Sequence, residues 1–405
     1  MNALTDLRGD IPKDVIRPWH LPDAPNANVC PFRAADSIRD GPDIFYTVID
    51  DPLNHGARGH WTVTRYSLQR EVLQNPEVFS SKRIADYAML LGEDWPLVPL
   101  ELDPPEHAQY RDLVNPLFSP KRVNAMEAGV REAAVELIEA LRDQGGCDFM
   151  KAFGRPFPVG VFMRLMGLPL EDMPIFLKWE EDVLRGESLE AMAAAAASIK
   201  EYLLDLMAKR RKQPTDDLVS FAVNAKIGGK PWSNERVLGL CYLLFVGGLD
   251  TVAAVLGFTF QEMAAHPEQQ RVIKRDKSII PQALEEYLRA FGVVETFRYL
   301  TRDYEFHGNQ LKKGERVVIH TSYSSRDDTF YENPHEIDFN RKETRHLTLA
   351  AGPHRCLGAH LARREFQIAL EEWSTRVPEF RLTEGAEAIV HAVGVMGVDY
   401  LPLSW

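Results

Sequence analysis

The longest apolar stretch of the chain is VLGLCYLLFVGGLDTVAAVLGFTF, residues 237–260, and its length predicts a single long helix. Fully helical, it would be about 36 Å long, which is enough to cross a lipid bilayer. Asp250 lies well inside it, however, and a charge at the centre of a membrane helix costs roughly 2.5–3.5 kcal/mol. We therefore predict that this stretch is the buried central helix of a globular protein.

Shorter patterns predict the elements around this helix. Residues 357–377 carry apolar side chains at helical spacing and end before Pro378, which predicts a second helix. GHWTVTRYS, residues 59–67, is typical of a strand. Residues 304–320 predict a hairpin that turns at Lys313–Gly314.

No internal repeat or low-complexity linker divides the chain. The expected fold class is therefore mainly α with small β-sheets (α+β), in a single domain of residues 1–405. Within it, residues 1–35 are expected to be an extended N-terminal segment, because residues 11–32 are rich in proline.

Composition and charge exclude some classes of function. A chain of 405 residues with 45% hydrophobic and 26% charged residues can bury a sizeable core. The net charge of −12 argues against nucleic acid as a general partner, because phosphate binding needs a basic field. The N-terminus shows no apolar signal core, and the four cysteines form no C-x-x-C pair. We therefore expect a cytoplasmic protein with reduced thiols and no membrane association.

The long helix contains the unusual sequence GGLDT. Gly247 and Gly248 remove side chains, so a flat group can lie against the backbone there. Asp250 must find partners or water, because an unpaired buried charge is very costly. Thr251 can bond back to the carbonyl four residues earlier and bend the helix. A tolerated kink and a functional groove with a proton-carrying pair at its floor both remain open.

A second unusual stretch is LAAGPHRCLG, residues 349–358, which holds Cys356 in a bend just before the second predicted helix. The N–H groups of such a bend and the positive end of a helix dipole both favour thiolate over thiol. Four roles remain open: an inert buried thiol, a zinc ligand with His360, a nucleophile with His354 or His360 as base, or a haem-iron ligand.

Together the two stretches resemble the cytochrome P-450 superfamily, the haem-thiolate monooxygenases. The family's cysteine loop, Phe-x-x-Gly-x-x-x-Cys-x-Gly, is matched here by Leu349, Gly352, Cys356 and Gly358, with leucine in place of the usual phenylalanine. The motif of its oxygen-binding helix is matched by Gly247, Gly248, Asp250 and Thr251. The likeness covers nearly the whole chain and is closest to the bacterial camphor hydroxylase group.

A third family motif, Glu-x-x-Arg, is matched by Glu286 and Arg289. By spacing alone this pair would be an ordinary surface ion pair one helical turn apart. The resemblance gives the two residues a structural role instead.

The resemblance implies a cytochrome P-450 fold that holds haem b (iron protoporphyrin IX) between the long helix and the cysteine loop. Cys356 would be the axial ligand of the haem iron. Thr251 would hydrogen-bond dioxygen and Asp250 would relay protons, so that one oxygen atom enters a C–H bond of the substrate. The haem propionates would be held by the basic residues His107, Arg111, Arg298 and His354.

The electrons must come from outside, because no flavin or nicotinamide motif is evident in the chain. The resemblance implies a [2Fe-2S] ferredoxin and its NAD(P)H-dependent reductase. Four arginines could form a basic patch on the cysteine side that steers an acidic ferredoxin: Arg70, Arg111, Arg363 and Arg364.

The substrate is expected to be small, apolar and terpenoid-like. Trp95 stands where the camphor hydroxylases have a tyrosine that holds the substrate ketone, and Tyr87 is a second polar handle. The expected apolar walls are Leu97, Leu100, Leu243, Val246, Gly247 and Val294. A camphor-like or cineole-like monoterpenoid is favoured, with a norisoprenoid ketone as an alternative. A peroxide-dependent peroxygenase and a haem-based sensor are the competing functions.

Overall fold

The computed structural model describes residues 11–48, 59–85, 87–186 and 188–405. These residues fall into two compact units, which we call the sheet unit and the helical unit. The sheet unit contains residues 11–48, 59–84, 285–356 and 389–397, and the helical unit contains the remaining described residues. The expectation of a single domain stays a prediction.

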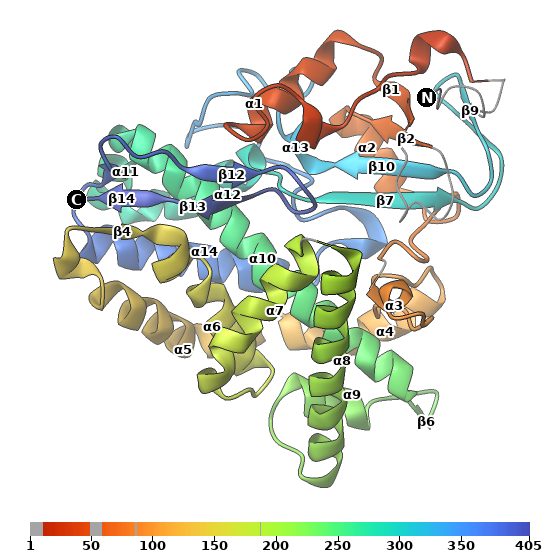
Figure 1. Ribbon diagram of the computed structural model, residues 1–405, viewed down its shortest axis with the longest axis horizontal. Coiled ribbons are helices and arrows are strands. Elements are labelled where there is room, and N and C mark those ends of the chain that lie inside the picture. The colour runs from red at the N-terminus through yellow and green to blue at the C-terminus, as the bar shows by residue number, and fades with distance from the viewer. Residues whose placement is uncertain (1–10, 49–58, 86, 187) are drawn as a thin grey trace. The chain divides into compact units, whose positions relative to one another are not determined.

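A five-stranded sheet organises the sheet unit, in the order β1-β2-β10-β7-β3 (Figure 1). Strands β1 and β2 are antiparallel with Ile44 opposite Val63, whereas β10 runs parallel to β2 with Val317 opposite Trp61. Because Trp61, Val63 and Val317 are fully buried, this register fixes the core of the unit. The strands are β1 (Ile44–Val48), β2 (Gly59–Val63), β3 (Phe79–Ser80), β7 (Glu295–Leu300), β8 (Tyr304–Phe306), β9 (Asn309–Leu311), β10 (Arg316–His320) and β12 (Ile389–His391).

The predicted strand over 59–67 is confirmed for its first five residues, after which helix α2 (Tyr66–Gln74) begins. The other helical segments of this unit are η2 (Lys13–Val15), η3 (Leu21–Asp23), α1 (Pro31–Asp36), η4 (Ser37–Asp40), α13 (Thr321–Ser325) and η10 (Gly352–His354).

The prediction of an extended N-terminal segment over residues 1–35 is wrong for much of its described part. From residue 11 onward the chain forms two 3-10 turns, η2 and η3, and then the helix α1. Pro31 is the first residue of α1, where its fixed φ suits a helix and its missing N–H is not needed. Phe32 is 1% exposed and packs against Phe291, so burial of this ring anchors the segment. Residues 1–10 lie outside the described residues.

The hairpin predicted over 304–320 turns at a different place. β8 and β9 are joined at His307 and Gly308, whose φ values of 47° and 82° are both left-handed, as a tight two-residue hairpin turn requires. The stretch around Gly314 forms a second turn that leads into β10, and β10 pairs with β2 and β7. The prediction chose the wrong one of two glycine turns, because both allow a left-handed backbone.

The helical unit is built around α10 (Asn234–Ala265), with α7 and α8 lying side by side (Figure 1). Its other helices are α3 (Tyr87–Leu90), α4 (Glu106–Val114), η5 (Asn115–Phe118), α5 (Pro120–Glu139), η6 (Arg142–Gln144), η7 (Met150–Gly154), α6 (Pro156–Leu165), η8 (Leu170–Asp172), α7 (Met173–Arg185), α8 (Leu189–Lys212), α9 (Leu218–Asn224), α11 (Pro267–Arg275), η9 (Lys277–Ile279) and α14 (Ala359–Arg376). Its short strands are β4 (Gly146–Asp148), β5 (Lys226–Ile227), β6 (Lys230–Pro231), β11 (Arg381–Leu382) and β14 (Pro402–Ser404). Helix α12 (Ile280–Ala290) and strand β13 (Gly397–Tyr400) have residues in both units.

Both predicted helices of this unit are confirmed. α10 extends the predicted 237–260 at both ends, from the Ser233 cap to the residue before His266–Pro267. It is the one helix in the described part of the chain that is long and apolar enough to cross a membrane, but 67% of its most apolar window is buried in the protein. A core helix can be as long and as apolar as a membrane-spanning helix. The burial of α10 inside the protein is what distinguishes it as a core helix. α14 covers nearly all of the predicted 357–377.

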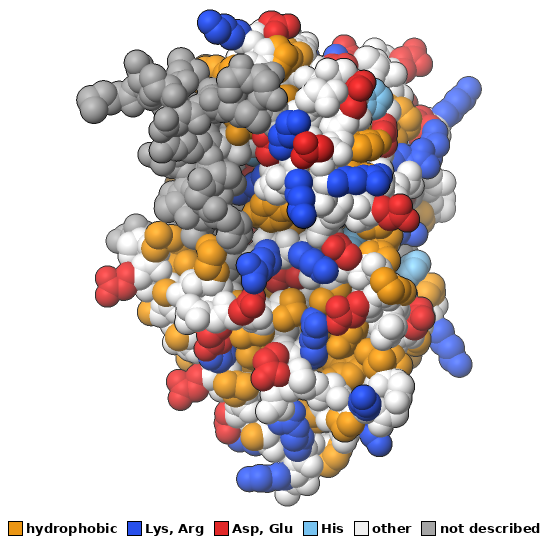
Figure 2. Space-filling view, turned by 90° about the vertical axis from the view of Figure 1, so that its right-hand side faces the viewer, with side chains coloured by type: hydrophobic (Ala, Val, Ile, Leu, Met, Phe, Trp, Pro, Cys, Tyr) orange, Lys and Arg blue, Asp and Glu red, His pale blue; other side chains and the backbone are white. Residues whose placement is uncertain are grey.

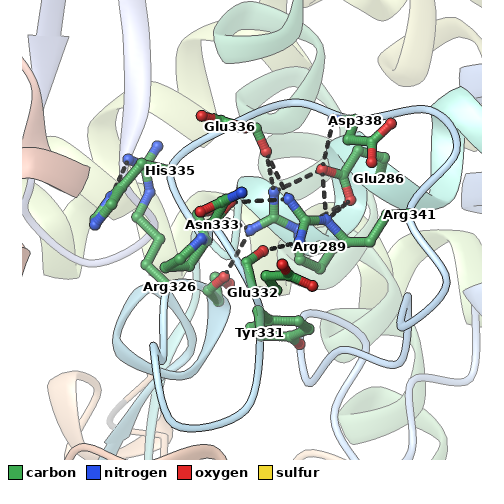
Figure 3. A network of polar contacts seen from close by, with 12 residues as sticks. Glu286, Arg289, Arg326, Tyr331, Glu332, Asn333, His335, Glu336, Asp338 and Arg341 are labelled. Atoms are coloured by element: carbon green, nitrogen blue, oxygen red, sulfur yellow. Dashed lines mark hydrogen bonds and ion pairs between the residues drawn. The ribbon is translucent and has the colours of Figure 1, made fainter.

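The Glu286–Arg289 pair lies in the core of the sheet unit, and the surface ion pair suggested by its spacing alone is wrong. Both side chains are fully buried, with 2.8 Å between Arg289 Nη2 and Glu286 Oε1. Arg341 is a third member that the sequence did not reveal, and its Nε lies 3.0 Å from both carboxylate oxygens (Figure 3). Arg289 also donates to three backbone carbonyls, those of Ser325, Pro334 and Glu336. The network therefore fixes the chain between β10 and the cysteine loop.

Glu286→Gln tests the energetic role of this network. The variant keeps the shape of the side chain but leaves two buried guanidinium groups without a counter-charge, so we expect the free energy of unfolding to fall by about 3–5 kcal/mol. Urea unfolding followed by circular dichroism measures the change. Glu379→Gln is the matched control: it breaks the Arg271–Glu379 pair, which is exposed and screened by water, so the free energy of unfolding should hardly change. Equal small losses in both variants would contradict the proposed role.

Candidate active site

The loop that carries Cys356 is closed by its own backbone. The Cys356 N–H donates to the Leu349 carbonyl over 2.9 Å, and η10 lies within the loop. Gly352 has a φ of +68°, and a Cβ at this position would lie 2.3 Å from the Leu73 carbonyl oxygen. Only glycine fits there, so the glycine of the motif holds the loop against α2. The Cys356 side chain is half-buried.

The four predicted propionate ligands are divided between the two units. Arg298 is buried on β7, where its Nη1 donates to the Phe297 carbonyl over 2.7 Å, and His354 is buried on η10. In the helical unit, α4 carries His107 and Arg111 one turn apart. Burial and, secondly, the Arg111 charge lower the pKa of His107 to about 4, so His107 is a neutral imidazole at neutral pH. His107 therefore offers a hydrogen bond, and Arg111 offers the charge.

The middle of α10 has an incompletely buried stretch, although most of the helix is buried. A Cβ at Gly247 would meet no atom within 4 Å, so this glycine borders open space. The Thr251 hydroxyl donates to the Gly247 carbonyl over 3.2 Å, which is the back-bond expected from the sequence. The exposed or half-buried residues of this stretch are Leu243, Leu244, Val246, Gly247, Gly248, Thr251 and Val252. The predicted catalytic and pocket residues Leu243, Val246, Gly247 and Thr251 therefore share one accessible stretch of the helix.

Asp250 is buried beside this stretch and is paired with α7. Its Oδ2 lies 3.1 Å from Arg185 Nη1, and the Nη2 of the same arginine lies 2.8 Å from Glu180 Oε1. Sequence reasoning found Asp250 but missed both partners. Their spacing of five residues on α7 carries no signal, because the two meet Asp250 only through tertiary packing.

The predicted polar handles of the substrate pocket form an aromatic group in the helical unit. The rings of Trp95 and Tyr87 lie 5.1 and 5.5 Å from the ring of Tyr242 on α10. The Trp95 indole N–H donates to Glu93 over 2.5 Å, and Glu93 is also paired with Lys200 on α8. The Trp95 donor is therefore engaged within the protein. Tyr242 and Glu93 were not expected from the sequence.

The remaining predicted wall residues are distributed as follows. Leu97 is buried and Leu100 is half-buried in the segment between α3 and α4. Val294 belongs to the sheet unit, where its backbone forms an isolated bridge with Val395.

The predicted basic patch is weaker than its sequence suggested. Arg364 on α14 is paired with Glu127 over 2.9 Å, which offsets its charge, and Arg363 donates to the Ala359 carbonyl of its own helix. Arg70 is exposed on α2 and Arg111 is half-buried on α4. On the face drawn in Figure 2, basic and acidic side chains are interspersed.

The zinc alternative for Cys356 finds no ligand set in the described ranges. Among residues 11–48, 59–85, 87–186 and 188–405, no three His, Cys, Asp or Glu side chains lie together in a way that could hold a metal ion.

Comparison with known proteins decides the family. Residues 169–373 match the model of the cytochrome P450 family. A probable cytochrome P450 127A1 from Sinorhizobium fredii is 40% identical over 94% of this chain and 92% of its own length. The chain belongs to the cytochrome P450 family.

A solved structure supports the same assignment. The crystal structure of CYP101J2 matches with a TM-score of 0.88 and 34% identity, covering 99% of this chain and all of that one. A steroid C26-monooxygenase from Mycolicibacterium smegmatis is 29% identical over 87% of this chain and 90% of its own length. The resemblance seen in the sequence is confirmed, as is the predicted fold class.

The protein is therefore a cytochrome P450 monooxygenase with haem b as its cofactor, and it needs dioxygen and a redox partner. The described residues fit this cofactor. Cys356 offers a half-buried thiol in a loop closed by its hydrogen bond to Leu349, and the open space at Gly247 suits a flat group against a helix. Arg111 supplies positive charge suited to carboxylates.

Gly352→Ala tests whether this glycine shapes the cysteine loop. The added Cβ would collide with the Leu73 carbonyl at a left-handed φ, so the loop must move, and we expect the variant to lose most of its haem. Haem content per chain, measured from the absorption spectrum, checks this. Gly314→Ala is the matched control: its φ is +84° with no atom within 4 Å of the added Cβ, so it carries only the backbone strain of about 1–2 kcal/mol. Equal haem content in the two variants would contradict the prediction.

Proposed function

We propose that this P450 hydroxylates a C–H bond of a small, compact, apolar substrate, a camphor-like or cineole-like monoterpenoid, with electrons from a [2Fe-2S] ferredoxin. The accessible stretch of α10 carries this proposal. Its side chains Leu243 and Val246 are apolar, and its single hydroxyl belongs to Thr251. The Trp95 N–H is already bonded to Glu93, so few polar handles remain, which suits a substrate with little polar surface.

Cys356 would hold the haem by ligating its iron. Bound haem supplies the redox chemistry that activates dioxygen, and a thiolate ligand favours O–O cleavage. The loop hydrogen bond between Cys356 and Leu349 and the steric requirement at Gly352 orient the thiol before the cofactor binds. We assign the propionate carboxylates to His107, Arg111, Arg298 and His354, of which His107 acts as a neutral donor.

Asp250 and Thr251 are the proposed proton-delivery pair. The Thr251 hydroxyl is partly accessible on α10, and its bond to Gly247 leaves its oxygen able to accept another hydrogen bond. Asp250 is one residue away and is held by Arg185, so its carboxylate can take up and release a proton while its charge stays compensated. This arrangement favours dioxygen over peroxide as the oxidant and distinguishes the protein from a peroxygenase.

Several finer assignments belong to the same proposal. The partner is a ferredoxin reduced by an NAD(P)H-dependent reductase, and the location is the cytoplasm. A norisoprenoid ketone is the alternative substrate, and a haem-based sensor is the alternative function outside enzymes. Substrate turnover with a ferredoxin system separates the enzyme from the sensor.

Cys356→Ser tests the axial ligand. We expect the reduced, carbon-monoxide-bound protein to show a strongly red-shifted Soret band that the serine variant lacks, because a hydroxyl does not provide a thiolate. Cys30→Ser removes another half-buried thiol of the sheet unit and should keep the band. A red-shifted band in the Cys356 variant would refute the assignment.

A substrate screen tests the size and polarity of the pocket. We expect a monoterpenoid ketone or cyclic ether to shift the haem spin state at micromolar concentration, and a steroid to give no shift, because we propose a site for a compact apolar molecule. Optical titration of the ferric protein measures both. A shift with the steroid alone would overturn the proposed substrate class.

A further inference from the structure

A buried carboxyl group, Glu180 on α7, lies beside Asp250 and has no role in the assignments above. Its side chain is only 4% exposed, compared with 7% for Asp250 and 16% for Arg185. Arg185 bridges the two carboxyl groups, with Nη1 3.1 Å from Asp250 Oδ2 and Nη2 2.8 Å from Glu180 Oε1. Two buried carboxyl groups that share one guanidinium repel each other when both are ionised, which favours a proton on one of them.

The surrounding charges favour a proton on Glu180 near neutral pH. Burial raises the pKa of Glu180 to about 7, helped by the negative charge of Asp250 and opposed by Arg185. The charge of Arg155, at the start of α6, also lowers the pKa of Glu180. Arg155 is itself paired with Asp399 over 2.8 Å, however. On the α8 side, Tyr202 donates its hydroxyl to Asp172 and is not a competing charge. One cation for two buried carboxyl groups leaves one negative charge to be neutralised by a proton.

A purely structural reading of Glu180 has a physical weakness. Arg185 and Asp250 alone would form a complete ion pair, and adding a second buried carboxylate costs desolvation free energy without a second cation. A neutral glutamine of the same shape could accept the Arg185 bond equally well. What glutamate adds is a proton that can leave.

We propose that Glu180 is the proton donor to Asp250 and that the pair, bridged by Arg185, is the point where a solvent proton is stored for delivery towards Thr251. In each cycle the Glu180 O–H bond breaks and an O–H bond forms on the Asp250 carboxylate. Glu180 becomes the carboxylate that Arg185 compensates, and it is reprotonated from water at the partly exposed edge of Arg185. This inference rests on the proposed role of Asp250, and Glu180 acts on the reaction only through that residue.

The first measurement is independent of turnover. We expect the carboxyl resonances of ¹³C-glutamate-labelled, haem-loaded protein to include one that titrates near pH 7. This titration should disappear in Glu180→Gln and persist in Glu181→Gln, the exposed neighbour on the same helix. A Glu180 carboxyl that titrates in the ordinary acidic range would overturn the proposal, even if the hydroxylase activity is confirmed.

The second measurement is the fraction of NADH recovered as product, from pH 6 to pH 8. We expect this fraction to fall in the wild type as pH rises through about 7, because the pair loses its stored proton. Glu180→Gln should reduce it about fivefold or more at pH 6, a modest part of the rate factor available to a positioned acid, and remove the pH dependence. At pH 8 the fraction of NADH recovered as product should be the same in the wild type and in Glu180→Gln. Glu180→Asp should restore part of the fraction that Glu180→Gln loses at pH 6.

Controls separate this proposal from the proposed function. Glu181→Gln should follow the wild-type profile, and Thr251→Ala should release peroxide at every pH. An intact carbon monoxide spectrum and spin-state shift in Glu180→Gln establish that the fold and haem site survive. If Glu180→Gln keeps the wild-type pH profile, the proton-donor role fails while the hydroxylase function stands. If no terpenoid is turned over but the titration near pH 7 is found, the proposed substrate fails and the proton storage stands.

Discussion

The helical unit depends on one constraint, which is the compensation of a carboxylate buried in its central helix. Asp250 interrupts an otherwise apolar stretch of α10, and an isolated charge at that depth would be prohibitively unstable. Arg185 reaches it from α7, so the packing of α7 on α10 is fixed by charge as well as by shape. The same pair places an ionisable group one residue from Thr251, in the accessible part of the helix. The stability of the unit and the proposed proton delivery therefore depend on the same contact.

The sheet unit also buries a carboxylate, that of Glu286, and compensates its charge with two arginines. Glu286, Arg289 and Arg341 are buried together, and the arginines use their remaining N–H groups on backbone carbonyls of a segment without regular structure. That segment leads to the cysteine loop, whose shape then depends on Gly352 and on the bond between Cys356 and Leu349. Buried charge thus orders a region that has few strands or helices of its own. The loop needs this order because the thiol that we propose as the iron ligand must be held in place.

The aromatic group around Tyr242 shows how polar atoms are removed from an apolar site. Trp95 gives its N–H to Glu93, and Glu93 is neutralised by Lys200 on α8. The indole keeps its apolar faces while its polar edge is satisfied within the protein. Trp95 thereby presents hydrocarbon surface while its own N–H is satisfied, whereas the buried Tyr242 hydroxyl has no hydrogen-bond partner among the described residues. The arrangement of Trp95 supports a compact substrate bound mainly by shape.

The sequence by itself determined the long helix, the helix after the cysteine, the cysteine loop and the family, because these follow from local periodicity and from motifs of fixed spacing. Tertiary structure alone decided that Arg185 and Glu180 meet Asp250, that Arg341 completes the Glu286 network, and that Arg364 is neutralised by Glu127. It also moved the hairpin turn to His307–Gly308 and made α1 helical at Pro31. The physical reason is the same in each case. Charge compensation and ring burial bring together residues that are far apart in the chain. A local sequence pattern therefore cannot predict which distant side chain will make the contact.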